Sequence, residues 1–137
     1  MRAEFVKILC GAFSLRSAEQ TAFSDVAPGV WYAPYAAAAG GCGIVQGSDG
    51  RFLPDESITR EDAAVLIWRT LVQAGEDFKE ASGGPPDRND ISGYAKDGVL
   101  QMYSAGLISG MSDGRFCPKN LLTRAQCAQI VANALRR

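Results

Sequence analysis

The chain has 137 residues, 47% of them hydrophobic, which is enough to bury one ordinary core and excludes a largely disordered protein. Its 14 lysines and arginines nearly balance 15 aspartates and glutamates, which excludes a long-range field that would attract nucleic acid or an anionic membrane. Histidine is absent, so the commonest general base and metal ligand is missing.

The first predicted element is a helix over residues 2–13. Its apolar residues recur at the spacing of one helix face: Phe5, Ile8, Leu9, Ala12 and Phe13. Glu4 stands at the third helical position of a capping box, but Met1 occupies the place of the capping threonine. We therefore expect the natural sequence to continue upstream, with this helix closing a truncated unit.

A helix-loop-helix unit is predicted after a short linker over residues 14–22. Pro34 suits the first turn of a helix that continues into the alanine run, and a glycine-rich loop follows. In this loop the dipeptide Asp49-Gly50 predicts a tight turn. Thr59 is the predicted N-cap of the second helix, with Asp62 completing a capping box. The apolar face of that helix carries Ala63, Leu66, Ile67 and Leu71.

The same unit occurs a second time. The segment Gly43–Gly47 returns as Gly106–Gly110, 63 residues later, and Ser48–Pro54 returns as Ser112–Pro118, 64 residues later. Met111 is therefore one extra residue in the later copy. Such self-similarity is typical of repeat architectures.

The helices of this later copy have their own start signals. Ser92 is the predicted cap of the opening helix, which carries Tyr94, Ala95, Val99, Met102 and Tyr103. Thr123, with Gln126 three residues later, is the predicted cap of the closing helix. The apolar face of the closing helix carries Cys127, Ile130, Val131, Ala134 and Leu135.

We therefore predict an all-α fold of tandem helix-loop-helix repeats. Residues 1–22 form the closing helix and linker of the truncated first repeat, 23–73 the second repeat, 74–89 a linker, and 90–137 the third repeat. One pair of short helices cannot bury its apolar stripe alone, so the three closing helices are expected to pack with pseudo-threefold symmetry. A linear solenoid is the alternative.

These residues resemble the S-layer homology (SLH) repeat. The second repeat carries the resemblance in Phe23-Ser24-Asp25, Trp31-Tyr32, Gly43–Gly47, Asp49–Phe52, Pro54 and Ile58–Glu61. The third repeat carries it in Asp87, Tyr94-Ala95, Gly106–Gly110, Asp113-Gly114, Phe116, Pro118 and Thr123-Arg124. Pro85 replaces the expected aromatic residue before Asp87, and Tyr94 stands where tryptophan is usual.

The resemblance implies an extracellular module of the bacterial cell surface and S-layer, usually three repeats in a three-pronged spindle. Such modules bind cell-wall polysaccharide noncovalently, and in several members the polymer is ketal-pyruvylated. The resemblance places binding at the closing-helix motif, here Thr59-Arg60-Glu61 and Thr123-Arg124. A guanidinium can pair with a pyruvyl carboxylate through two parallel hydrogen bonds, and helix N–H groups also favour an anion. Arg60 and Arg124 are therefore the first ligand-binding candidates, and Arg2 occupies the corresponding place in the first repeat.

Other roles are open for these residues. The arginine after the capping threonine could bridge to a carboxylate or carbonyl of a neighbouring repeat. Trp31 and Tyr94 could stack on sugar rings, although burial between helices is the commoner role of large rings in small domains. The cysteines, Cys10, Cys42, Cys117 and Cys127, show no metal-ligand spacing, so buried free thiols are favoured over a disulfide.

The leading hypothesis is a nonenzymatic anchor that attaches a larger surface protein to the cell wall without a metal or cofactor. No two carboxylates are placed as an acid and base pair, and no nucleophile has a base. No apolar run reaches the roughly 18 residues of a membrane helix. The alternative is a structural self-assembly module that binds protein rather than sugar. Apolar surface left by the missing part of the first repeat further predicts a homodimer.

Overall fold

Five α-helices form the described part of the computed structural model, which comprises residues 1–16, 21–79, 81 and 83–137. They are α1 (Arg2–Ala12), α2 (Ala33–Gly41), α3 (Arg60–Gln73), α4 (Lys96–Ser104) and α5 (Arg124–Leu135), with two 3₁₀ turns, η1 (Arg88–Asp90) and η2 (Gly93–Ala95), before α4. These residues contain isolated bridges but no strand, which confirms the all-α prediction. None of the described helices has the length and apolar character required to cross a membrane.

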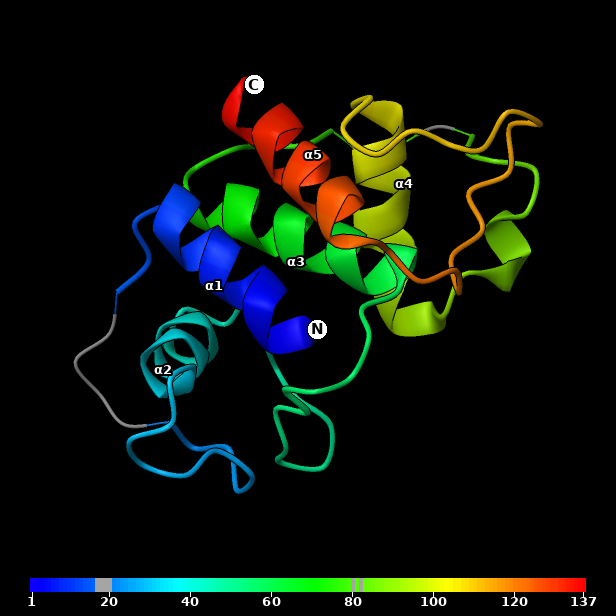
Figure 1. Cartoon of the computed structure of the whole chain (residues 1–137). Helices are drawn as coiled ribbons and strands as arrows, with labels where there is room; N and C mark the ends of the chain where they lie inside the picture. The colour runs from blue at the N-terminus through cyan, green and yellow to red at the C-terminus, as the bar shows by residue number, and fades with distance from the viewer. Residues whose placement is uncertain (17–20, 80, 82) are drawn as a thin grey trace. The chain divides into compact units, whose positions relative to one another are not determined.

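The chain divides into two compact units, residues 1–57 and 58–137. In the first unit α1 packs against α2, and in the second unit α3 packs against α4, η2 and α5 (Figure 1). Each unit begins with the closing helix of one repeat and continues with the opening helix and loop of the next. The division between the units therefore falls inside the second repeat, just before its closing helix. Pseudo-threefold packing of the closing helices stays a prediction.

The start of α1 shows how a closing helix holds the loop that follows it in the chain. The N–H of Arg2 donates to the carbonyl of Glu56 at 2.8 Å, and the N–H of Ala3 donates to that of Pro54 at 3.1 Å. The first N–H groups of a helix have no partner within the helix, so these two bonds satisfy groups that would otherwise need water or a cap. Met1 supplies no side-chain cap, as its sequence position suggested.

The start of α3 repeats this contact in the second unit. The N–H of Arg60 donates to the carbonyl of Asn120 at 2.8 Å, and the N–H of Glu61 donates to that of Pro118 at 3.0 Å. Thr59 is the predicted N-cap, and its hydroxyl accepts the N–H of Asp62 at 3.2 Å. The Asp62 carboxylate, predicted to complete a capping box, accepts the Tyr94 hydroxyl. Closing helices are therefore related by a shift of 58 residues, whereas the loops they hold are related by 64.

The aspartate near the start of each repeat fixes the end of the same loop. Both oxygens of Asp25 accept backbone N–H groups, from Phe52 at 2.7 Å and from Leu53 at 2.8 Å. Burial alone would raise the pKa of the Asp25 carboxyl, but these bonds to its ionised form bring the pKa below its ordinary value. Leu53 has φ 59°, a left-handed backbone conformation that the paired carboxylate helps to hold.

Asp87 makes the same clamp in the second unit. Its oxygens accept the N–H groups of Phe116 and Cys117, both at 2.8 Å. Burial again opposes ionisation, yet the two bonds bring the pKa of Asp87 below its ordinary value. Cys117 has φ 56°, close to that of its counterpart in the first unit. The loop end is thus built in the same way twice.

The tips of the two loops differ by the extra residue. In the first unit Ser48 and Arg51 exchange both backbone hydrogen bonds at 2.9 Å, and Asp49 and Gly50 have φ 51° and 74°. This is the two-residue turn that the Asp-Gly dipeptide predicted. In the second unit the N–H of Met111 donates to the Arg115 carbonyl at 2.7 Å across a turn of three residues.

An aromatic ring covers the buried phenylalanine of each loop, but it comes from different places in the sequence. In the first unit Phe23 lies 5.6 Å from Phe52, between ring centroids. In the second unit Pro85 replaces Phe23, and Tyr103 of α4 lies 6.4 Å from Phe116. The helical counterpart of Tyr103 is Gly40, where an added Cβ would lie 3.0 Å from the Phe23 ring. The second unit thus lacks the ring of Phe23 but has that of Tyr103 in its place.

Three details of the sequence predictions need correction. Ser92 does not cap a helix through its side chain: α4 begins at Lys96, and the Ser92 hydroxyl donates to Glu61. Ile8 and Leu135, predicted on the apolar faces of α1 and α5, are 39% and 52% exposed. The four described cysteines are free thiols, but only Cys10 and Cys127 are buried. Burial, followed by the nearby Cys42 thiol, raises the pKa of Cys10 to about 11, which makes it unreactive.

Candidate functional site

Arg60, the first ligand-binding candidate, is buried at the start of α3 and only 7% exposed. Its Nε donates to the carbonyl of Phe116 at 2.8 Å, and its Nη2 donates to the carbonyl of Ser109. The guanidinium carbon also lies 4.9 Å from the centroid of the Phe116 ring. The guanidinium is therefore not open to solvent, because it bonds carbonyls of the third repeat's loop. These are the bridging contacts named as the alternative role, and its ligand contact stays a prediction.

The other two arginines of this motif have different surroundings. Arg124 is exposed at the first position of α5, beside Thr123, whose side chain forms a complete capping box with Gln126. The Thr123 hydroxyl accepts the Gln126 N–H at 3.2 Å, and the Thr123 N–H donates to Gln126 Oε1 at 2.9 Å. Arg2 is half-buried at the start of α1. Of the three, Arg124 is best placed to meet a ligand from solvent.

Trp31 and Tyr94 lie at equivalent positions, each just before the opening helix of its repeat. Trp31 is 49% exposed and Tyr94 is 60% exposed. The expectation that they are core residues was wrong, because both rings remain at the surface beside the helix start. Large exposed rings on small domains are typical of binding surfaces, since one face is apolar and available for contact.

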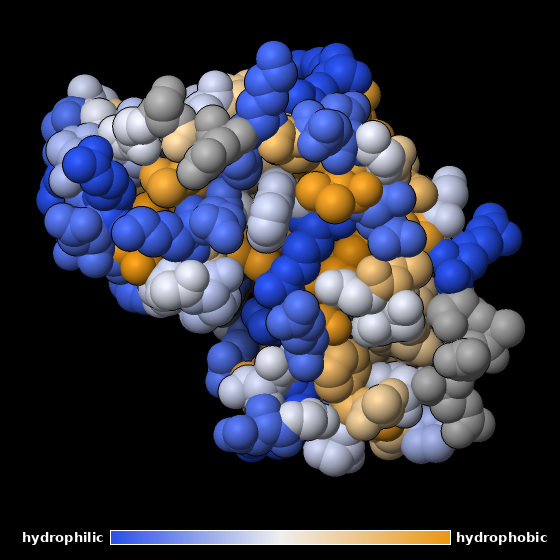
Figure 2. Space-filling model, turned by 180° about the vertical axis from the view of Figure 1, so that it is seen from behind, coloured by the Kyte–Doolittle hydropathy of each residue, from blue (hydrophilic) through white to orange (hydrophobic). Residues whose placement is uncertain are grey.

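The other large apolar side chains that are exposed among the described residues carry no aromatic ring. They are Met1, Ile8, Val72, Leu121 and Leu135. On the face shown in Figure 2, hydrophobic areas are interrupted by hydrophilic side chains. Scattered exposed aliphatic residues are normal for a protein surface, so the two aromatic rings are the more informative feature.

Other rings hold Trp31 in place. Its ring meets Tyr32 edge to face, with centroids 5.3 Å apart and an interplanar angle of 90°. Tyr32 in turn stacks on Phe52, 6.1 Å away, which is fully buried. A row of aromatic contacts therefore connects the exposed ring to the core of the first unit. A platform held in this way loses little conformational entropy when a ligand binds.

Hydrogen bonds, rather than rings, hold Tyr94. Its hydroxyl donates to Asp62 Oδ1 at 2.5 Å and approaches Glu61 Oε1 at 3.4 Å. Burial of the hydroxyl, followed by these bonds and the charge of the two carboxylates, raises the pKa of Tyr94 well above its ordinary value. The phenol therefore stays neutral and keeps donating, which fixes the ring over the start of α3.

Glu61 organises a polar cluster that the sequence did not predict. Its side chain is 3% exposed, and its carboxylate accepts the Ser92 hydroxyl at 2.7 Å, the Ser92 N–H at 2.9 Å and the Lys119 ammonium at 2.6 Å. The Lys119 ammonium also contacts the Ser92 hydroxyl. Burial would raise the pKa of Glu61, but these donors bring it below its ordinary value.

The repeat pattern explains why this cluster was missed. In the first unit, Ala3 stands at the position of Glu61 and Asp55 at that of Lys119. A comparison of the repeats therefore treats both positions as variable. The one available signal was Glu61 itself, as a member of the closing-helix motif.

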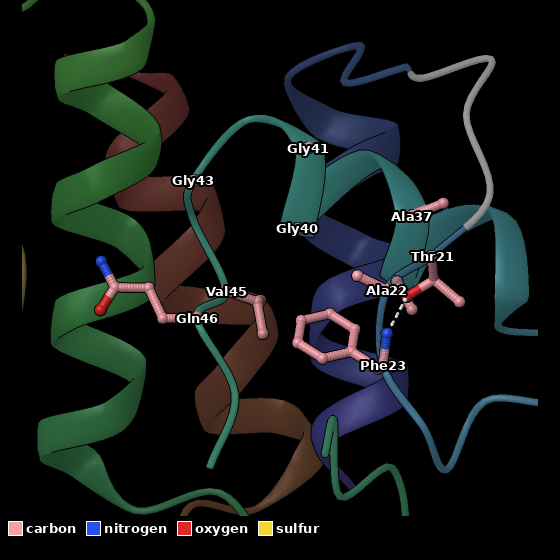
Figure 3. Close-up of a pocket in the computed structure, with 10 residues that line it drawn as sticks. Thr21, Ala22, Phe23, Ala37, Gly40, Gly41, Gly43, Val45 and Gln46 are labelled. Atoms are coloured by element: carbon pink, nitrogen blue, oxygen red, sulfur yellow. Dashed lines mark hydrogen bonds between the residues drawn. The ribbon is translucent and has the colours of Figure 1, made fainter. Parts of the chain in front are cut away.

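A pocket of about 380 Å³ opens in the first unit beside the end of α2 (Figure 3). Its lining residues are Thr21, Ala22, Phe23, Ala36, Ala37, Gly40, Gly41, Gly43, Val45 and Gln46. Among these described lining residues there is no charged side chain. The pocket is therefore unsuited to an anionic group, and its small side chains mark the place where the second unit has Leu100 and Tyr103 instead.

The described residues contain no group of three or more Cys, Asp or Glu side chains that could hold a metal ion. Each unit instead offers one fixed aromatic ring with polar or charged side chains beside it. Rings can stack on the apolar face of a sugar, and the polar groups can bond its hydroxyls or acidic substituents. This arrangement is suited to binding a saccharide.

Comparison with known proteins finds the same repeated unit twice in this chain. A family model described as S-layer homology domain matches residues 22–64 and 86–128. Both matched segments run from the linker before a repeat into its closing helix.

Three relatives illustrate the range of proteins that share this region. The chain is 34% identical to Exoglucanase XynX of Acetivibrio thermocellus over 99% of its own length and 13% of that protein. It is 31% identical to Amylopullulanase of Thermoanaerobacterium thermosulfurigenes, over 99% of the chain and 8% of that protein. It is 47% identical to Surface-layer 125 kDa protein of Lysinibacillus sphaericus, over 36% of the chain and 4% of that protein. The chain thus spans a small part of each relative.

Proposed function

Because the chain belongs to the S-layer homology domain family, we propose that it anchors a surface protein by binding cell-wall polysaccharide noncovalently. S-layer homology domains of surface proteins attach them to the cell wall, and the location of this chain is the extracellular cell surface. The enzyme names of some relatives describe proteins of which this chain covers a small share. The proposal assigns no catalytic step to the chain itself.

The observation that carries the proposal is the pair of exposed rings, Trp31 and Tyr94. They occupy equivalent positions 63 residues apart, and each is fixed by its own neighbours in its own unit. A repeated polymer is best bound by repeated contacts, because linked sites raise the effective affinity well above that of each one. Two rings on one chain fit this requirement.

The cations of the closing helices support an acidic polymer. Arg124 is exposed and can pair with a carboxylate such as that of a pyruvyl ketal through two parallel hydrogen bonds. Thr123 lies beside it at the start of α5, and the positive end of a helix dipole favours an anion. Arg2 is a further candidate. Arg60 and Thr59 support the site by fixing the loop of the third repeat in the proposed arrangement.

Cosedimentation with purified insoluble cell wall tests the proposal. The natural chain should pellet with the wall, and the double variant Trp31→Ala/Tyr94→Ala should need roughly a hundredfold more wall, about tenfold for each ring. Leu135→Ala, which removes a 52% exposed apolar side chain, is the matched control and should behave like the natural chain. Equal pelleting of all three would overturn the role of the rings.

Self-assembly is the competing function, and the predicted homodimer belongs with it. Light scattering at several concentrations, without polymer, separates the two. A mass that rises with concentration in a chain that fails to bind wall polymer would favour assembly.

A further inference from the structure

A lysine is held against the exposed ring of the first unit. Lys7 lies on the exposed side of α1, and its ammonium nitrogen is 5.7 Å from the centroid of Trp31 and 5.8 Å from that of Tyr35. Both distances are within the range of cation–π attraction, which restrains a side chain that is otherwise flexible. The cation is thus kept beside the aromatic platform.

This arrangement is absent from the described residues of the second unit. At the helical shift of 58 residues, the counterpart of Lys7 is Val65, which is buried. At the shift of 63, the counterpart of Tyr35 is Gly98, which has no ring to offer. The exposed ring there, Tyr94, lies against the carboxylates of Glu61 and Asp62 instead. The two platforms therefore differ in the charge beside the ring.

Two cations on closing helices, Arg60 and Lys7, have different surroundings and therefore suit different roles. Arg60 donates two hydrogen bonds to the carbonyls of Phe116 and Ser109, and only 7% of the residue is exposed. Lys7 is an exposed cation. The two aromatic rings attract its charge without accepting a conventional hydrogen bond, so its N–H groups can still donate to a ligand. It lies five residues after Arg2, beyond the motif.

We propose that Lys7 and Trp31 form a recognition pair for an acidic sugar in the first unit. The sugar ring contacts the exposed part of Trp31, and the ammonium of Lys7 pairs with a carboxylate substituent. This inference rests on the proposed function, since it names the residue that selects a charged over an uncharged saccharide at the same surface. Lys7 has no place in the closing-helix motif and was not a candidate from sequence.

The test uses two small probes that differ at one carboxyl group, which is charged in the first and a neutral ester in the second. One is methyl 4,6-O-(1-carboxyethylidene)-glucopyranoside as the free acid, and the other is its methyl ester. Binding to the full chain is followed by chemical-shift titration. Lys7→Met should weaken binding of the acid roughly fivefold and leave that of the ester unchanged, because only the charged pair is removed. Lys7→Arg should retain most of the preference, and the exposed Lys79→Met should have no effect.

The outcomes distinguish failure of the role of Lys7 from failure of the proposed saccharide binding. If Lys7→Met leaves the acid-to-ester ratio unchanged while Trp31→Ala weakens both probes, the inference is overturned and the saccharide site stands. If Lys7→Met weakens both probes equally, the lysine only supports the ring, and the inference is again overturned. If the natural chain binds neither probe nor purified wall polymer, the inference and the proposed function both fail.

Discussion

The Nε of Arg60 donates to the carbonyl of Phe116 at 2.8 Å, although 56 residues separate the two in the chain. The same guanidinium lies over the Phe116 ring. Phe116 is fully buried, and its N–H is held by Asp87. Phe116 is therefore held by the guanidinium of Arg60, the carboxylate of Asp87 and the ring of Tyr103.

We expect Arg60→Ala to lower the free energy of unfolding by about 2–4 kcal/mol. The substitution removes two charge-assisted hydrogen bonds and leaves two carbonyls without them. Urea denaturation measures the change. Arg124→Ala is the matched control, since the exposed Arg124 begins α5 in the same motif, and its stability should change by less than about 0.5 kcal/mol. Equal losses in the two variants would contradict the structural role of Arg60.

The aspartate clamps predict a stability that falls in acid. The pKa values of Asp25 and Asp87 lie below ordinary, because the two backbone bonds to each ionised carboxylate outweigh the opposing effect of burial. Their contribution is therefore fully present above the unfolded pKa of about 3.9 and is lost as pH falls through the lower folded value. Asp25→Asn/Asp87→Asn should be less stable at pH 7 and should lose less stability between pH 5 and pH 3 than the natural chain. If the free energy of unfolding of the variant and of the natural chain falls in parallel with pH, the two aspartates are not the source of the acid sensitivity.

Gly47 should be far less replaceable than Gly43, although their φ angles, 74° and 75°, are nearly the same. A Cβ at Gly47 would lie 2.7 Å from the Arg51 carbonyl oxygen and 2.7 Å from the Phe23 ring, whereas one at Gly43 would meet nothing within 4 Å. Gly43→Ala should cost about 1 kcal/mol for its backbone conformation alone. Gly47→Ala should cost at least about 2 kcal/mol more, because atoms must shift. Thermal melting of the pair checks this, and similar melting temperatures would contradict it.

Lys119 should stabilise the fold through Glu61 even though its own side chain is 60% exposed. Lys119→Met leaves the buried carboxylate with fewer donors, and we expect a loss of about 1–3 kcal/mol. The pKa of Glu61 should also rise, because burial would then be opposed mainly by the two bonds from Ser92. Carboxyl chemical shifts against pH measure this. An unchanged titration of Glu61 would show that Lys119 is not its effective partner.

Sequence patterns predicted the helices well where local signals decide them. Thr59 and Thr123 each precede the first residue of a helix, and the glycine turns fall between opening and closing helices as expected. N-cap preference and 3.6-residue periodicity depend on neighbours a few residues away, so one chain is enough to read them. The tight turn at Asp49-Gly50 followed for the same reason.

The long-range contacts were beyond such patterns. The ring that covers Phe116 comes from Tyr103, which lies 18 residues after Pro85, the position where the first unit has its covering ring. Only packing in three dimensions relates positions 85 and 103. Burial of Arg60 depends on carbonyls 49 and 56 residues away. Periodicity reports which face of a helix is apolar and cannot report which loop covers it. The exposed rings of the candidate site were named, but their surroundings were not.

The emission of Trp31 provides the most direct test of the proposed saccharide-binding surface. The chain has two tryptophans, so Trp68→Phe leaves Trp31 as the single reporter. Titration with soluble, purified wall polysaccharide should change its emission to a saturable limit, with the same midpoint as binding measured by cosedimentation. If the emission stays constant at polymer concentrations that fully bind the chain, Trp31 does not contact the polymer, and the proposed binding surface is wrong.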